Sequence, residues 1–74
     1  MSKLPVVRPK DLLRAFLKKD FFPRKSKSSH VVLKHPDGRM VVIPLHPRPI
    51  PKGTLSKIIK KAEISPEELR RLLK

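Results

Sequence analysis

Apolar residues recur at helical spacing near the beginning of the chain. Residues 11–19 (DLLRAFLKK) carry four apolar positions on one helical face: Leu12, Leu13, Phe16 and Leu17. Pro9 precedes them and suits the first helical turn, where its missing N–H costs nothing. The pattern predicts a helix that begins near Pro9 and ends after Lys18 and Lys19, whose charges complement the negative end of the helix dipole.

The last third of the chain predicts two further helices. Residues 53–62 (GTLSKIIKKA) place apolar side chains at positions i, i+3, i+4 and i+7, with Thr54 as the predicted N-cap. Residues 65–74 (SPEELRRLLK) begin with Ser65 as the N-cap, followed by a proline, and Glu68 would complete a capping box. A short last helix therefore follows the second helix directly.

β-Branched residues fill the middle of the chain and predict strands. Residues 21–27 (FFPRKSK) form a short extended segment that Pro23 confines to a sheet edge or a bulge. The runs SHVVLKH and RMVVIPLH predict two strands joined by the turn HPDGR (residues 35–39), in which Gly38 supplies a positive φ. The expected result is an antiparallel meander.

The order of these elements predicts the fold class. Three prolines within residues 46–52 indicate a stiff connection between the strands and the second helix. One helix, three strands and two helices form an α+β fold, a two-layer sandwich with the helices on one face of a small sheet. We expect residues 1–74 to make a single domain with a modest core, preceded by an extended arm over residues 1–8.

The net charge of the chain is the property of the sequence that says most about its ligand. Nineteen Lys and Arg residues stand against six Asp and Glu residues, which gives a formal net charge of +13. Such a field attracts polyanions, and nucleic acid is the first candidate because phosphate neutralisation releases counterions. The alternative to nucleic-acid binding is a basic surface that serves only solubility. An anionic membrane is disfavoured, because no helix pairs a Lys-rich face with Trp or Phe anchors.

The chain contains no cysteine, which excludes disulfides and thiolate zinc sites. Its apolar runs are far shorter than the ~20 residues of a membrane span. The first eight residues lack the apolar segment of a signal peptide. We therefore expect a soluble protein of the cytoplasm.

The carboxylates exclude several enzyme classes. Four of the six have local structural explanations in helix first turns or in the hairpin turn: Asp11, Asp37, Glu67 and Glu68. The remaining two, Asp20 and Glu63, cannot build a two-metal nuclease site. A glycine-rich phosphate loop, a cysteine nucleophile and tyrosine are also missing. We therefore expect no metal and no cofactor, and any catalyst must be histidine or lysine.

RNA offers a reaction that histidine performs without a metal. The 2′-hydroxyl attacks its own phosphodiester, and His30 suits the proton transfers because its reference pKa lies near neutrality. Ser29 stands beside it and could hydrogen-bond the imidazole or the substrate. Strand alternation does not show where His30 points, because residues 31–33 are all apolar. We interpret His35, which precedes a proline at a turn, as structural, and His46 as a weaker candidate for substrate contact.

Several short motifs, in order, give the chain a resemblance to a known family. The motifs are Ser28-Ser29-His30 after a basic stretch, HPDGR (residues 35–39), VVIPLH (residues 41–46) and KGTLSKIIKKAEIS (residues 52–65). The likeness extends over about residues 4–73, and the chain resembles the HicA family of toxins, mRNA interferases paired with a HicB antitoxin. Five positions depart from the family pattern. Ser28, Asp20 and Glu63 replace glycines, and Pro47-Arg48 replaces Ser-Gly.

The resemblance implies a fold like the double-stranded RNA-binding domain. It also implies a type II toxin that cleaves mRNA without a metal, with His30 as the catalytic residue. The implied partner is an acidic HicB-like antitoxin that inhibits the toxin by covering the face that carries His30. The candidate RNA contacts are Lys25, Lys27, Ser29, Arg39 and Lys52. Two other hypotheses stay open: a non-catalytic RNA-binding module of the same fold, and a basic protein whose ligand is an acidic partner.

Overall fold

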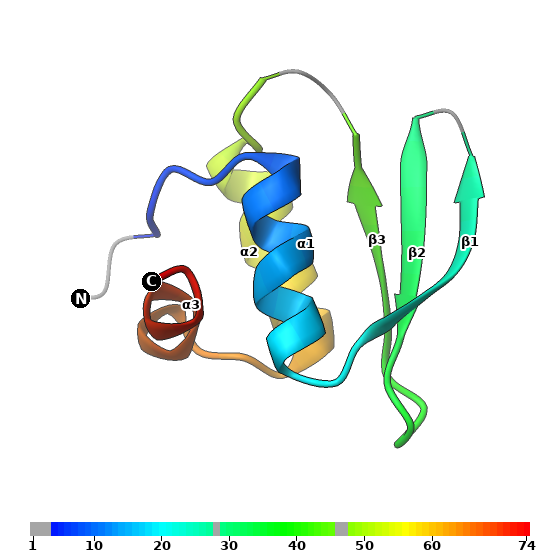
Figure 1. The fold of residues 1–74 in the computed structure, drawn as a ribbon. Coiled ribbons are helices and arrows are strands. Elements are labelled where there is room, and N and C mark those ends of the chain that lie inside the picture. The colour runs from blue at the N-terminus through cyan, green and yellow to red at the C-terminus, as the bar shows by residue number, and fades with distance from the viewer. Residues whose placement is uncertain (1–3, 28, 46–47) are drawn as a thin grey trace.

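The computed structural model describes residues 4–27, 29–45 and 48–74, with the backbone alone described for residues 25–27. The elements follow the predicted order (Figure 1): α1 (Pro9–Lys18), β1 (Phe22–Lys27), β2 (His30–Lys34), β3 (Met40–Pro44), α2 (Lys52–Ala62) and α3 (Pro66–Leu72). This order confirms the α+β class, and it is consistent with a sandwich like the double-stranded RNA-binding domain that carries one additional C-terminal helix.

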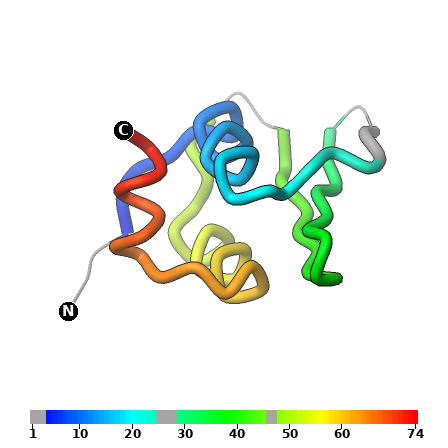
Figure 2. Tube along the Cα trace, turned by 60° about the horizontal axis from the view of Figure 1, so that its bottom comes forward, coloured from blue at the N-terminus to red at the C-terminus, as the bar shows by residue number. Residues whose placement is uncertain are grey.

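The three strands form one antiparallel sheet in the order β1-β2-β3. Figure 2 shows the strands on one side of the molecule and the helices on the other, with β3 nearest to α1 and α2. Val31 and Leu33 of β2, with Val41 and Ile43 of β3, are buried on the face toward the helices. The alternate residues of both strands therefore lie on the opposite face, which is called the outer face below.

Strand β1 is an edge strand with an irregular register. Phe22 pairs with Lys34 and Pro23 with Leu33, and the next pair joins Lys25 to Val32. Arg24 is thus an extra residue in the strand, as in a β-bulge. This confirms the prediction that the proline confines the segment to an edge or a bulge.

The core lies between the sheet and the helices. Apolar residues from every described element except β1 are buried in it, and both Phe16 and Phe21 have no exposed surface. Their ring centroids lie 5.0 Å apart in a tilted arrangement. Within the described residues, no helix has the length and apolar character needed to cross a membrane.

The N-terminus of α2 differs from the prediction. The helix begins at Lys52, and its N-cap is Pro51, without a side-chain hydrogen bond. Thr54 therefore lies inside the first turn and is not the N-cap. The physical reason is that the carbonyl oxygen of Pro51 already accepts the hydrogen bond from the N–H of Leu55, at 2.8 Å, and so opens the helical ladder before Thr54.

The N-terminus of α3 matches the prediction in part. Ser65 is the N-cap, and its hydroxyl oxygen accepts a hydrogen bond from the backbone N–H of Glu68 at 3.1 Å. The Glu68 carboxylate instead pairs with Lys19, the C-cap of α1, at 2.5 Å. The side-chain ammonium of Lys18 also donates to the carbonyl oxygens of Leu72 and Lys74, each at 2.9 Å. The end of α1 thus holds α3 in place.

Among the described residues, two that are not glycine adopt left-handed backbone conformations. Asp20, after α1, has a φ of 65°, and Glu63, the C-cap of α2, has a φ of 59°. These are two of the positions at which the resemblance leads us to expect glycine. Gly38 in the hairpin turn has a φ of 103°, as the turn prediction required.

Candidate active site

His30 is the first residue of the central strand of the sheet. It pairs with Lys27 of β1 on one side and with Pro44 of β3 on the other. The backbone N–H of Leu45 donates to the carbonyl oxygen of Ser29 at 2.7 Å, which extends the β2–β3 ladder one step beyond His30. The backbone of His30 is therefore fixed from both sides, as a precisely placed functional group requires.

The His30 side chain lies on the outer face of the sheet and is exposed. The next residue, Val31, is buried toward the helices, so alternation directs His30 outward. Val42 and Met40 of β3 share this face and are 43% and 47% exposed. The structure thus answers the question of orientation that the apolar sequence of β2 left open.

Ser29 contacts the imidazole directly. Its hydroxyl oxygen lies 2.9 Å from Nδ1 of His30, within hydrogen-bond distance. A hydroxyl can donate to an unprotonated Nδ1 or accept from a protonated one. Ser29 can therefore hold the ring while the ring gains or loses a proton, which is what a general acid–base residue needs from its neighbour.

Two of the candidate lysines lie on β1, beside β2, and the third lies at the beginning of α2. The register sets Lys27 opposite His30 and Lys25 opposite Val32, so their backbones flank β2 on its β1 side. Their side chains are outside the described part of the structure, as are Ser28 and His46. Lys52 is exposed at the beginning of α2.

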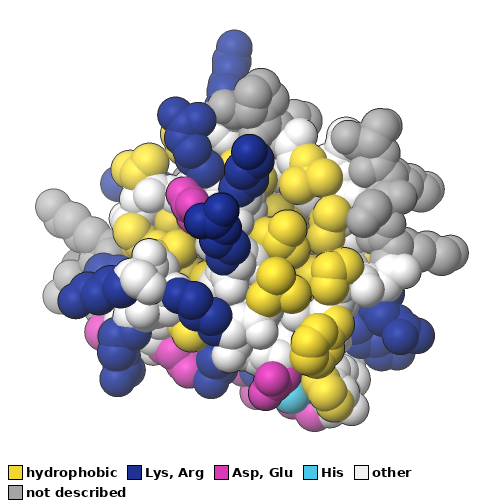
Figure 3. Space-filling model, viewed as in Figure 1, with side chains coloured by type: hydrophobic (Ala, Val, Ile, Leu, Met, Phe, Trp, Pro, Cys, Tyr) yellow, Lys and Arg dark blue, Asp and Glu magenta, His cyan; other side chains and the backbone are white. Residues whose placement is uncertain are grey.

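The helices point their N-termini toward the His30 end of the molecule. In Figure 1, α1 and α2 both begin at the end where β1 turns into β2, and both end beside the β2–β3 hairpin. The positive ends of their dipoles therefore lie at the His30 end. Three carboxylates lie at or beside the opposite ends of these elements: Asp20, Asp37 and Glu63. Figure 3 shows most acidic side chains of the visible face along its lower edge, whereas Lys and Arg reach its top.

Arg39 lies apart from the other candidate RNA contacts. It precedes β3 at the hairpin, at the end of the sheet remote from His30. Its guanidinium donates to an Asp37 carboxylate oxygen at 2.8 Å and to the carbonyl oxygen of Ala62, and lies 5.2 Å from the ring centroid of Phe21. The structure does not bring Arg39 together with His30, and these contacts fasten the hairpin to the end of α2.

The hairpin also accounts for His35. Its Nδ1 accepts a hydrogen bond from the backbone N–H of Asp37 at 3.1 Å, and its ring and that of Phe21 lie 5.1 Å apart between centroids in an edge-to-face arrangement. The backbone N–H of Arg39 donates to the Asp37 carboxylate and lowers the pKa of that carboxyl below its usual value of 3.8. This placement agrees with the structural role predicted for His35.

One functional candidate on the outer face, Phe22, was not identified from the sequence. Phe22, Arg24 and Lys34 line a shallow pocket together with His35 and Pro36. The bulge signal of Pro23 was visible in the sequence, but nothing in the pattern showed that Phe22 stays exposed beside a fully buried Phe21. Within residues 4–27, 29–45 and 48–74, no three His, Cys, Asp or Glu side chains gather as metal ligands would.

Comparison with known protein families supports the resemblance seen in the motifs. A family model described as the HicA toxin of bacterial toxin–antitoxin systems matches residues 9–64 of the 74-residue chain. The match runs from the first residue of α1 to just beyond the end of α2, and so includes the whole sheet and His30. No curated protein sequence matches the chain. The chain belongs to the HicA family, the toxins of bacterial toxin–antitoxin systems.

Proposed function

We propose that the protein is a metal-independent endoribonuclease that cleaves mRNA, with His30 as its catalytic residue. The observation that carries the proposal is the exposed His30 imidazole, fixed at the end of the central strand and contacted at Nδ1 by the Ser29 hydroxyl at 2.9 Å. Family membership makes the chain a toxin with a cognate antitoxin. The nuclease chemistry is inferred from the residues.

The reaction is a transesterification within the RNA. The 2′-oxygen forms a bond to phosphorus, the bond from phosphorus to the 5′-oxygen breaks, and the products carry a 2′,3′-cyclic phosphate and a 5′-hydroxyl. One group must take the 2′-proton and another must protonate the leaving 5′-oxygen. His30 performs one or both of these transfers, and a lysine or a water molecule performs any that remains.

Cations around the scissile phosphate stabilise the charge that develops on it. Lys27, whose backbone pairs with that of His30, and Lys25, whose backbone pairs with that of Val32, are the proposed cations. Lys52, at the N-terminus of α2, is assigned to RNA contacts at the same end of the molecule. Arg39 is assigned a structural role, because its Nε donates to Asp37 and one of its terminal nitrogens donates to the carbonyl oxygen of Ala62, at the end of the sheet remote from His30.

The antitoxin is proposed to be an acidic HicB-like protein that covers the outer face. That face exposes Val42 and Met40 beside cationic Lys34, which suits a partner with both apolar and acidic side chains. Covering it would remove His30 from the RNA. Because such a partner binds only the folded toxin, excess antitoxin should raise the melting temperature by mass action.

The experiment that tests the proposed function compares RNA cleavage by wild type and His30→Ala in the presence of a chelator. Lys57→Ala is the control, because Lys57 lies on the exposed surface of α2 and belongs neither to the candidate site nor to the hairpin. We expect His30→Ala to lose cleavage, typically by at least ~100-fold, while both variants stay folded by circular dichroism. Cleavage by His30→Ala at the wild-type rate would contradict the assignment. RNA binding without cleavage by wild type would favour the non-catalytic module.

A further inference from the structure

Phe22 is the one phenylalanine of the three that the fold leaves open to solvent. Phe16 and Phe21 have no exposed surface, whereas Phe22 is 50% exposed on the outer face at the beginning of β1. Its partner in the register is Lys34, the last residue of β2. An aromatic ring in this position contributes little to the core, and its apolar area is available to a ligand.

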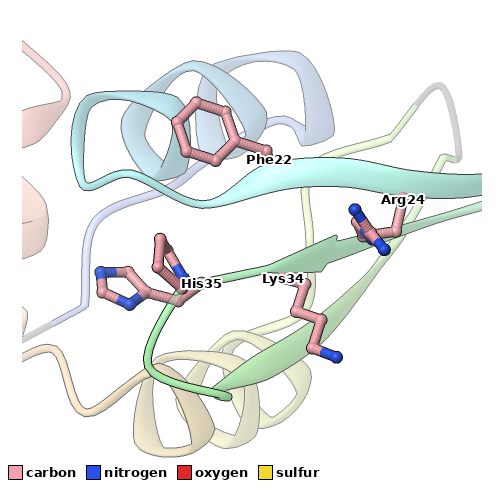
Figure 4. A pocket seen from close by; sticks show the side chains of 5 residues that line it. Phe22, Arg24, Lys34 and His35 are labelled. Atoms are coloured by element: carbon pink, nitrogen blue, oxygen red, sulfur yellow. The ribbon is translucent and has the colours of Figure 1, made fainter.

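The Phe22 ring forms one wall of the shallow outer-face pocket. The pocket encloses about 260 Å³, and its other lining residues are Arg24, Lys34, His35 and Pro36. In Figure 4, Phe22 and His35 lie toward one side of the pocket, and Arg24 and Lys34 lie toward the other. The pocket thus has a flat apolar part and a cationic part.

The β-bulge explains why Arg24 lines the same pocket as Phe22 and Lys34. Arg24 is the extra residue between the Pro23–Leu33 and Lys25–Val32 pairs, so it does not follow the regular alternation of β1. Lys34 reaches the pocket from the opposite strand. Among the five lining residues there is no carboxylate. Stacking on an aromatic ring combined with cations for the backbone is the chemistry by which proteins bind unpaired nucleotides.

One wall of the pocket, Lys34, lies on the same strand and the same face as His30. Lys34 follows His30 by four residues on β2, which corresponds to roughly 13 Å at the usual rise of a strand. A few nucleotides of single-stranded RNA span this distance. A strand bound along β2 could therefore present a phosphodiester to His30 and place a base of a flanking nucleotide in the pocket.

We propose that this pocket is a subsite for an unpaired nucleotide of the substrate RNA. Phe22 stacks on the base, and Arg24 and Lys34 contact the adjoining phosphates. The inference rests on the proposed function, because it takes the RNA bound at His30 as the ligand. It deepens that function by making the substrate a single-stranded segment, since a paired base cannot enter the pocket. The segment is recognised at both ends of β2, at His30 and in the pocket.

The test measures binding of wild type and variants to a single-stranded oligonucleotide in which every 2′-hydroxyl is methylated. Methylation removes the attacking group, so binding is measured without cleavage. Phe22→Leu, which keeps an apolar side chain without the ring, should weaken binding about tenfold, and Phe22→Tyr should stay within about twofold of wild type. Arg24→Ala should weaken binding more than Lys57→Ala, a control that removes one positive charge from the exposed surface of α2.

A second measurement locates the base. An oligonucleotide with one 5-iodouridine should cross-link to Phe22 on irradiation, and mass spectrometry of the digested complex should find the modified peptide. Phe22→Leu with wild-type affinity, or cross-links only to other residues, would overturn the inference. If RNA cleavage also persists, the proposed function stands without this subsite.

Two other outcomes separate the inference from its premise. RNA that cross-links to Phe22 in a protein that does not cut unmodified RNA supports the subsite and overturns the nuclease. If Phe22→Leu instead loses only its binding to the cognate antitoxin and keeps RNA affinity, the pocket belongs to a protein interface and the inference is wrong.

Discussion

Replacing Glu63 by glycine should stabilise the protein. Glu63 closes α2 in a left-handed conformation, with φ of 59° and ψ of 42°, and its backbone N–H meets the carbonyl oxygens of Ile59 and Lys60. This conformation costs an L-residue about 1–2 kcal/mol, and glycine avoids that cost. Glycine also raises the conformational entropy of the unfolded chain, which reduces the gain in the free energy of unfolding by about 0.4–1 kcal/mol. The expected net gain is about 0.5–1 kcal/mol, or about 2–8 °C in melting temperature for a domain of this size.

Glu63→Ala is the matched control for this prediction. It removes the same negative charge from the C-terminus of α2, where the helix dipole disfavours it, but it keeps the cost of the left-handed backbone. Thermal unfolding of the variants, followed by circular dichroism, should therefore place Glu63→Gly above Glu63→Ala. Asp20→Gly should gain less, because aspartate adopts this conformation more readily than glutamate. Equal melting temperatures for the glycine and alanine variants would refute the backbone argument.

Two further predictions concern parts of the fold outside the candidate active site. Leu69 of α3 is fully buried although it lies beyond the residues 9–64 that match the family, so Leu69→Ala should cost about 2–5 kcal/mol in urea unfolding. A cost near zero would show that α3 is not part of the cooperative unit. Because the fold lowers the pKa of Asp37, its carboxylate adds stability above pH 3.8 that disappears as the pH falls through the lowered value. Asp37→Asn should therefore lower the melting temperature at neutral pH and lose this difference in strong acid. A difference that stays constant with pH would contradict the role of the charge.

Local patterns in the sequence predict the elements well. The helical spacing of apolar residues correctly predicted the position of α1. The proline in residues 21–27 predicted an edge strand or a bulge, and the register of β1 confirms this. Ser65 capped α3 as predicted. Thr54 did not cap α2, because the carbonyl group of Pro51 opens the helix earlier. These features depend on neighbours within a few residues, and for that reason a single sequence carries most of them.

The arrangement of the site residues depends on contacts between residues far apart in the sequence, which local patterns do not reveal. The direction of His30 was undetermined, because the sheet keeps apolar residues on its outer face as well, with Val42 43% exposed. Arg39 was a plausible phosphate ligand in the sequence, yet its guanidinium meets Ala62, which lies 23 positions later in the chain. Phe21 and Phe22 are adjacent and chemically identical, and only the packing of α1 against the sheet decides that one is buried and the other open.

The central claim is that the RNA supplies its own nucleophile and the protein supplies acid–base chemistry at His30. The most direct measurement compares a chimeric oligonucleotide carrying one 2′-deoxynucleotide at the cleaved position with its all-ribose parent, in chelator, followed by analysis of the product ends. The account predicts that the parent yields 2′,3′-cyclic phosphate and 5′-hydroxyl ends and that the deoxy substrate resists cleavage. Cleavage of the deoxy substrate, or products with 3′-hydroxyl and 5′-phosphate ends, would contradict it.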